Sequence, residues 1–369
     1  MSTKIPRFDH RDQYRAIRRE VLEAIDRVLE SETVILGPAV RSFEQHFARF
    51  LGGGGIGVGV ASGTDALIIA LRALGIEAGD EVITVSHTSV ATVSAIRSVG
   101  AVPVFCDIDP QTLVMDVADA EKRITQSTRA IIPVHLYGNA VDMPALCRLA
   151  GQAGLKVVED CAQSCGTRID GRATGAWGDA GCFSFYPTKN LAAYGDGGIC
   201  LAPNQELADR IRAIRNYGMD AGQSAVWEGM NSRLDELQAA ILDVQLRHLP
   251  DYLKKRAAVA ECYRGLLSPR IAVPRTTQGA ENSYHLFVVE VEQRERVISC
   301  LHDSGIDCGV HYRTPVHLME AYRFLGYGEG SLPHTERAAK RVLSLPCYPE
   351  LPAEAVDQIC TVLNDACGN

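Results

Sequence analysis

The chain has 369 residues, which is enough for a large buried core and, by length, for two or more domains. Its net charge of −8 is spread without long runs of either sign, so nothing indicates the basic face of a nucleic-acid binder. No apolar stretch approaches the ~18 residues of a membrane span, and the N-terminus lacks an apolar signal region. We therefore expect a cytoplasmic protein with no nucleic-acid or membrane partner.

The 12 cysteines are scattered, with no Cys-x-x-Cys pair and no His-rich segment beside them. Several of them lie in apolar runs, where a free thiol behaves as a small hydrophobic side chain. The sequence therefore predicts reduced, mostly buried thiols and no metal site.

From residue 56 onward, short β-rich runs alternate with helical patterns. The expected strands are residues 56–60, 81–85, 102–106, 130–136 and 156–159. The expected helices between them are residues 64–74, 91–99 and 143–153. This alternation predicts an α/β protein with a large, mostly parallel sheet covered on both faces. Such sheets bind ligands at the carboxyl ends of their strands, where Ser62, His87 and Asp160 fall.

The second half of the chain changes pattern. A helical stretch runs from Ser232 to about Arg247, is broken by Pro250 and resumes to Leu267. Beyond it we expect a smaller α/β unit, with strands at 284–291 and 307–312 and helices at 294–304, 336–343 and 354–366. The domain boundary is placed near residue 250. Residues 1–250 form a large domain with an N-terminal helical segment, and residues 251–369 form a small C-terminal domain.

Lys189 and Asp160 are the two residues that together most clearly indicate a chemical function. A lysine that forms a Schiff base and a carboxylate that keeps a pyridine nitrogen protonated are what pyridoxal phosphate chemistry requires. Ser62-Gly63-Thr64 follows a strand and opens a helix, where backbone N–H groups favour a phosphate, and Ser184 adds a hydroxyl. Each residue alone has an ordinary explanation as a surface charge, a strand-end carboxylate or a helix cap.

Seven segments in order resemble the DegT/DnrJ/EryC1/StrS family, which are sugar aminotransferases of the aspartate-aminotransferase fold (fold type I). The resemblance extends from roughly residue 10 to residue 350. The segments are Ser62–Leu67, Gly79–Ile83, Val134–Gly138, Glu159–Gln163, Ser184–Asn190, Gly195–Gly198 and Asn231–Asp235.

The resemblance implies a role for each matching residue. Lys189 would be the Schiff-base lysine, Asp160 the partner of the pyridine nitrogen, and Gln163 a contact of the cofactor ring or its phenolic oxygen. Gly63, Thr64 and Ser184 would hold the phosphate, which Asn231 would reach from the other subunit of a homodimer. One position departs from many relatives: Ser89 stands where they carry an aromatic residue that stacks on the cofactor. Either His87 or a smaller contact would then face the ring.

The resemblance also implies the substrates. We expect transfer of an amino group from L-glutamate to a nucleotide-linked 3-keto-6-deoxyhexose, with dTDP as the first choice of nucleotide. A 4-keto sugar and a cyclitol ketone are the alternatives. A non-catalytic regulator on the same fold is a third interpretation, but the retained Lys189 and the absence of a helix-turn-helix extension favour an enzyme. The candidate substrate contacts are His87, Arg233, His311, Tyr312 and His317.

Overall fold

The computed structural model describes residues 4–368. Its central feature is a seven-stranded sheet in the order β1-β9-β8-β5-β4-β2-β3. Only β9 runs antiparallel to its neighbours. The strands are β1 (Ile56–Val60), β2 (Glu81–Val85), β3 (Val102–Cys106), β4 (Thr128–Ile131), β5 (Lys156–Asp160), β8 (Ala180–Ser184) and β9 (Gly198–Ala202).

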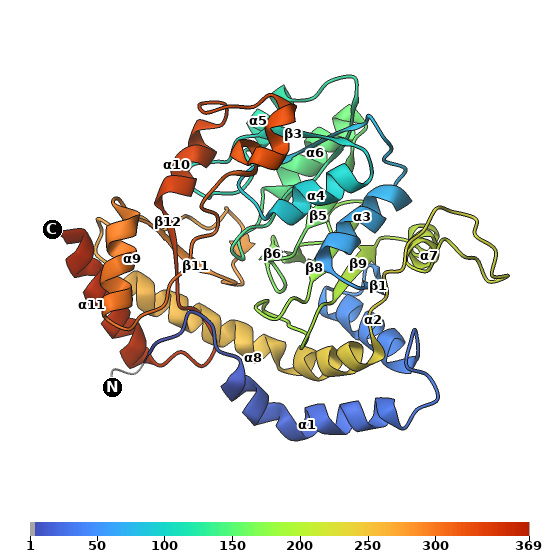
Figure 1. The fold of residues 1–369 in the computed structure, drawn as a ribbon, viewed down its shortest axis with the longest axis horizontal. Helices are drawn as coiled ribbons and strands as arrows, with labels where there is room; N and C mark the ends of the chain where they lie inside the picture. The colour runs from blue at the N-terminus through green and yellow to red at the C-terminus, as the bar shows by residue number, and fades with distance from the viewer. Residues whose placement is uncertain (1–3, 369) are drawn as a thin grey trace.

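Helices cover this sheet (Figure 1). Those that follow a strand of this sheet are α3 (Gly63–Ala73), α4 (Val90–Ser98), α5 (Val117–Lys122), α6 (Met143–Ala153) and α7 (Gln205–Ile214). The strands are almost entirely buried because both faces are covered, as expected for a mostly parallel sheet. The predicted fold class is therefore confirmed.

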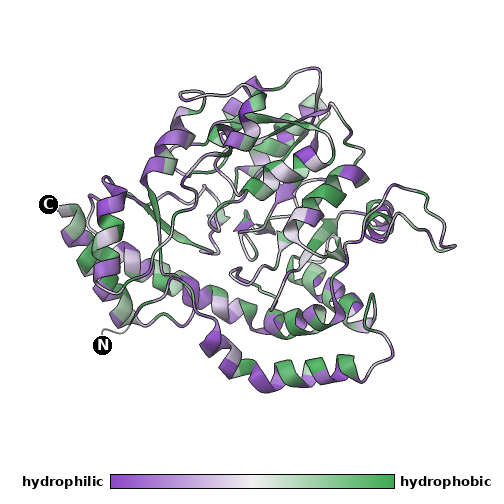
Figure 2. Cartoon of the chain, viewed as in Figure 1, coloured by the Kyte–Doolittle hydropathy of each residue, from purple (hydrophilic) through white to green (hydrophobic). Residues whose placement is uncertain are grey.

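Two N-terminal helices, α1 (Arg11–Leu29) and α2 (Pro38–Phe50), pack along the long helix α8 (Glu236–Leu266). Polar and apolar residues alternate in bands along α1 (Figure 2), and its buried positions recur at helical spacing. Those positions are Ile17, Val21, Ala24 and Val28.

The C-terminal part contains a two-stranded sheet of β11 (Phe287–Glu290) and β12 (Val342–Leu345). The helices of this part are α9 (Arg294–Asp303), η1 (Val316–Leu318), η2 (Glu320–Leu325), α10 (Pro333–Arg341) and α11 (Ala353–Gly368). A third small sheet joins β6 (Arg168–Ile169) and β7 (Arg172–Ala173) to β10 (Ala280–Glu281).

The expected break at Pro250 is wrong, because α8 continues through it. A proline inside a helix costs about 3 kcal/mol. Here burial offsets that cost: Leu249 and Tyr252 are buried beside the proline, and α8 packs on α1, α2 and α11. The boundary near residue 250 stays a prediction.

Two further expectations in the C-terminal part are corrected. Residues 307–312 form no strand and make only the isolated bridge between Gly309 and Ser344. The helix expected at 336–343 ends at Arg341. The apolar residues from Val342 onward instead form β12, which pairs with β11.

Candidate active site

A cavity of about 340 Å³ opens where the strands of the large sheet end, a size suited to a small ligand. Segments that follow β1, β2, β5 and β8 supply most of its polar lining, and residues 311–312 of the C-terminal part complete it. The predicted site residues that line it are Gly63, Thr64, Ser89, Asp160, Gln163, Ser184, Lys189, His311 and Tyr312.

One end of the cavity is suited to a phosphate. Ser62 caps α3 by accepting the Asp65 N–H at 3.1 Å, so the helix begins at the cavity with its remaining N–H groups available. A Cβ atom at Gly63 would lie 2.5 Å from the Cβ of Ser184, so only glycine lets these two segments meet. Thr64 and Ser184, which both carry a hydroxyl group, also line the cavity.

Lys189 lies in the loop between β8 and β9. Its backbone N–H closes a turn on the Tyr186 carbonyl at 2.8 Å. The neighbouring Asn190 amide holds the loop by donating to the Ser283 carbonyl at 3.1 Å. Burial lowers the pKa of the Lys189 amine to about 8, against the charge of Asp160, which raises it. About a tenth of the amine is therefore neutral at pH 7, far more than for an ordinary lysine, and this form can attack a carbonyl carbon.

Asp160 ends β5 and is buried. Its Oδ2 accepts from the Thr92 hydroxyl at 2.8 Å, and its Oδ1 accepts from the Ala162 N–H at 3.1 Å. Burial raises the pKa of this carboxyl group, whereas these two hydrogen bonds and the positive charge of Lys189 lower it. A buried carboxylate beside a lysine is suited to stabilise a positive charge on a bound ring.

Gln163 is held at both ends of its amide. Its Oε1 accepts the Tyr137 N–H at 3.0 Å, and its Nε2 donates to the Tyr312 phenol at 2.9 Å. Ser89 lines the cavity as the N-cap of α4, and Tyr312 lines it from the C-terminal part of the chain. The cavity therefore has a serine, and no aromatic ring, at this position.

The structure does not bring two of the predicted histidines to the cavity. His87 is buried with its Nε2 2.7 Å from the Tyr137 phenol, and burial lowers its pKa to about 4. His317 is buried between Ser86, 2.7 Å from its Nδ1, and Glu336, 3.3 Å from its Nε2. Both histidines have structural partners, and their substrate contacts stay predictions.

Asn231 and Arg233 also lie outside the cavity of their own chain. Asn231 is exposed and pairs with Asn216 in an isolated bridge. The Arg233 guanidinium lies 5.9 Å from the centre of the Tyr217 ring. Both residues close the base of the loop 216–231, which extends away from the body of the molecule beside α7 (Figure 1).

Sequence reasoning missed several lining residues, among them His285, Tyr186, Thr88 and Asp196. His285 is buried, its Nδ1 has no partner among the described residues, and burial lowers its pKa well below the usual value. It sits just before β11, so its sequence context indicates only the start of a strand.

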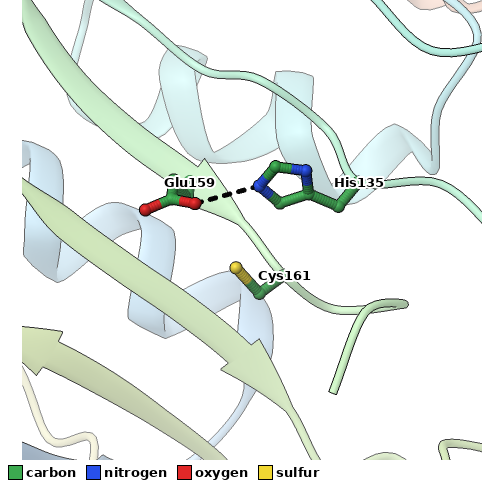
Figure 3. Close-up of side chains that lie close together, drawn as sticks. All are labelled: His135, Glu159 and Cys161. Carbon is green, nitrogen blue, oxygen red and sulfur yellow. Dashed lines mark hydrogen bonds and ion pairs between the residues drawn. The ribbon is translucent and has the colours of Figure 1, made fainter. Parts of the chain in front are cut away.

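Behind the cavity, His135, Glu159 and Cys161 form the one group with metal-ligand spacing in residues 4–368 (Figure 3). Their hydrogen bonds explain it without a metal. His135 Nδ1 accepts from the Val141 N–H at 3.1 Å, so its Nε2 carries the proton and donates to Glu159 at 3.0 Å. Glu159 also accepts three backbone N–H groups of the loop 175–178. The cluster ties this loop to β5.

Comparison with known proteins decides the family. The model of the DegT/DnrJ/EryC1/StrS aminotransferase family matches residues 15–364. The chain belongs to this family. Membership confirms the predicted resemblance, the enzyme class and pyridoxal phosphate as cofactor. The cavity fits that cofactor, because an amine, a buried carboxylate and a phosphate cradle all line it.

Three relatives illustrate the family. The chain is 45% identical to a dTDP-3-amino-3,4,6-trideoxy-alpha-D-glucose transaminase of Streptomyces venezuelae, covering 94% of this chain and 92% of the relative. It is 42% identical to a UDP-N-acetyl-3-dehydro-alpha-D-glucosamine 3-aminotransferase of Acidithiobacillus ferrooxidans, covering 98% of each. It is 41% identical to a protein of Geobacillus stearothermophilus named a pleiotropic regulatory protein, covering 95% of each.

Among solved structures, the crystal structure of DesV from S. venezuelae, in complex with a ketimine intermediate, has a TM-score of 0.97 to this chain. The two are 42% identical, and the match covers 99% of each chain. Residues 4–368 contain no helix both long and apolar enough to cross a membrane.

Proposed function

We propose that this protein transfers the amino group of L-glutamate to the 3-keto group of a nucleotide-linked hexose, with a dTDP-linked 6-deoxy sugar as the first choice. The observation that carries the proposal is the placement of Lys189 and Asp160 on one cavity with the cradle of Gly63 and Ser184. The relatives from S. venezuelae and A. ferrooxidans support the 3-position, since both are named for a 3-amino or 3-dehydro sugar. Their different nucleotides leave dTDP and UDP as the pair to test.

Lys189 and Asp160 have different proposed roles in the reaction. Bound pyridoxal phosphate supplies an aldehyde that condenses with amines and a ring that accepts electrons from the substrate carbon. Lys189 holds the cofactor and then moves a proton at its Nζ between substrate and cofactor carbons. Its pKa of about 8 suits both giving and taking that proton near neutral pH. Asp160 holds the positive charge on the ring nitrogen.

The remaining contacts orient the ligands. The α3 N-terminus, Thr64 and Ser184 hold the phosphate, and Gln163 contacts the ring or its phenolic oxygen. His311 and Tyr312 line the cavity from the C-terminal part of the chain, and we assign them to the sugar. Burial lowers the pKa of His311 to about 4, so it acts as a neutral hydrogen-bonding group.

We further propose a homodimer in which Asn231 completes the partner's phosphate site. Two features support this assembly. Asn231 is exposed and outside the cavity of its own chain, and the loop 216–231 carries exposed apolar side chains that a second copy would cover. Those side chains are Tyr217, Val226 and Trp227. Cytoplasmic localisation also stays a prediction.

The test is an assay of purified holoenzyme with glutamate and a panel of keto substrates. The panel contains dTDP- and UDP-linked 3-keto sugars, a dTDP-linked 4-keto sugar and a cyclitol ketone. We expect mass spectrometry to detect an amino sugar from a 3-keto substrate, and none with Lys189→Ala. Turnover of only the 4-keto sugar or the cyclitol would replace the 3-keto assignment. Lack of any turnover, with no spectral change on adding glutamate, would favour the regulator that the G. stearothermophilus name suggests.

A further inference from the structure

The side chain of Thr92 on α4 donates a hydrogen bond to a residue of another element, Asp160 on β5. Thr92 is the third residue of α4 and is completely buried. A threonine hydroxyl on a helix can bond to the backbone carbonyl four residues earlier. Here Oγ1 instead donates to Oδ2 of Asp160, 2.8 Å away on β5. Thr92 does not line the cavity, so it contacts the site only through other residues.

The chemistry of the groups sets the direction of these bonds. An ionised carboxylate only accepts, so the single hydroxyl proton of Thr92 is committed to Asp160. The Thr88 hydroxyl, 2.8 Å from Oγ1 of Thr92, must then donate to it. The other oxygen of Asp160 accepts the Ala162 N–H. Each oxygen is thus held by one donor from a different segment, and the plane of the carboxylate is fixed.

We propose that Thr92, supported by Thr88, is a positioning residue that keeps Asp160 ionised and aimed at the ring nitrogen of the cofactor. The inference rests on the role proposed above for Asp160. It adds Thr92 of α4, which does not line the cavity, and Thr88, which precedes α4 and does line it.

The proposed effect of Thr92 depends on whether the ring nitrogen of the cofactor or Asp160 binds a proton. With pyridoxal phosphate bound, the ring nitrogen and Asp160 would compete for one proton, and catalysis would need it on nitrogen. Burial favours the neutral acid, and the Thr92 hydroxyl opposes burial by stabilising the anion. Without that donor the carboxyl oxygen binds the proton more tightly, the ring loses its positive charge, and electron withdrawal from the substrate carbon weakens.

The experiment uses holoenzyme loaded with pyridoxal phosphate that carries ¹⁵N in its ring. The ¹⁵N chemical shift reports protonation of the ring nitrogen directly, independently of turnover. Thr92→Val and Thr92→Ala remove the hydroxyl, and Thr92→Ser retains it. Thr84→Val is the matched control, because Thr84 is equally buried but donates to the Ile132 carbonyl, away from Asp160.

We expect the ¹⁵N shift of Thr92→Val and Thr92→Ala to move toward the unprotonated value. We also expect the glutamate half-reaction to slow by about 10- to 100-fold, the size of a lost hydrogen bond to a charged group. Thr92→Ser and Thr84→Val should keep the wild-type shift. A folded Thr92→Val or Thr92→Ala with wild-type shift and rate would overturn the inference.

Asp160→Asn separates this inference from the proposal on which it rests. If Asp160→Asn moves the ¹⁵N shift and both hydroxyl-free Thr92 variants do not, the role of Asp160 stands and that of Thr92 fails. If Asp160→Asn leaves the shift unchanged, the assignment of Asp160 itself fails. If Thr84→Val moves the shift as far as Thr92→Val, the effect is general loosening of the core, and the specific role of Thr92 is overturned.

Discussion

The phenol of Tyr312 lies 2.9 Å from Nε2 of Gln163, and this hydrogen bond joins the C-terminal part of the chain to the segment after β5. Because the Oε1 of Gln163 accepts the Tyr137 N–H, the amide cannot rotate without losing a bond. Tyr312 therefore fixes the orientation of a side chain proposed to contact the cofactor.

Replacing Tyr312 with Phe tests this contact. The ring stays but Gln163 loses one partner, so we expect the glutamate half-reaction to slow by less than about tenfold, as for one neutral hydrogen bond. Stopped-flow absorbance measures it. Tyr322→Phe is the control, because it removes a comparable phenol bond, 3.1 Å to Ser94, outside the cavity. Equal losses in the two variants would contradict a specific role for Tyr312.

Asp160→Asn should slow the glutamate half-reaction by ~10² or more, because the ring nitrogen loses its negative partner; this is the scale on which transition-state electrostatic partners act. The cofactor should remain bound through its phosphate. Asp179→Asn is the control, since Asp179 accepts from the Val157 N–H at the opposite end of β5. Near wild-type turnover in Asp160→Asn would show that Asp160 is only a strand-end carboxylate.

The lowered pKa of Lys189 predicts how the apoenzyme takes up pyridoxal phosphate. Only the neutral amine attacks the aldehyde, so the rate of uptake should rise with pH and level off above about 8. Asp160 raises this pKa, so Asp160→Asn should move the midpoint to lower pH. Absorbance-monitored reconstitution across pH measures both. A rate still rising steeply above pH 9.5 would mean that burial does not lower the pKa of Lys189.

Burial of Lys189 should also make the folded apoenzyme less stable at low pH. The folded pKa of about 8 lies below the ordinary lysine pKa of 10.5, so the unfolded chain binds more protons between these pH values. The contribution of Lys189 to the free energy of unfolding should therefore rise as pH increases from 8 to 10.5. Lys189→Met should flatten this rise in urea titrations. An unchanged slope in the variant would contradict the shift.

Shared active sites predict complementation between two inactive variants. Mixing Lys189→Ala with an inactive Asn231 variant should restore up to about a quarter of wild-type activity, because a heterodimer assembles one intact site. Lys189→Ala mixed with Asp160→Asn is the control, since both defects lie on the same side of the site and no intact one can form. No recovery in the first mixture after confirmed subunit exchange would rule out the model.

Much of the fold was predictable because its strands and helices alternate locally. The helix at 143–153 matches α6, and the strand at 56–60 matches β1. Pairing between distant strands could not be predicted. Sequence periodicity does not show that β9 inserts between β1 and β8, nor that α3 crosses β9 so that Gly63 meets Ser184.

The candidate site was predictable where a residue type has a specific chemical use, as for Lys189 and Asp160. It was not predictable where the role depends on what a side chain meets in space. Thr92 is one of many hydroxyls in helices, and His285 precedes a strand that resembles any other. The sequence positions of His87 and His317, near strand ends or in loops, suggested a site. In the fold, His87 instead pairs with Tyr137 and His317 with Ser86.

The most direct test of the account is where the cofactor is attached. Holoenzyme should be yellow, and borohydride reduction followed by peptide mapping should find a pyridoxyl group on Nζ of Lys189. Lys189→Ala should lose both the colour and the modified peptide. A pyridoxyl group on another lysine, or an unchanged spectrum in Lys189→Ala, would contradict the assignment of this cavity as the active site.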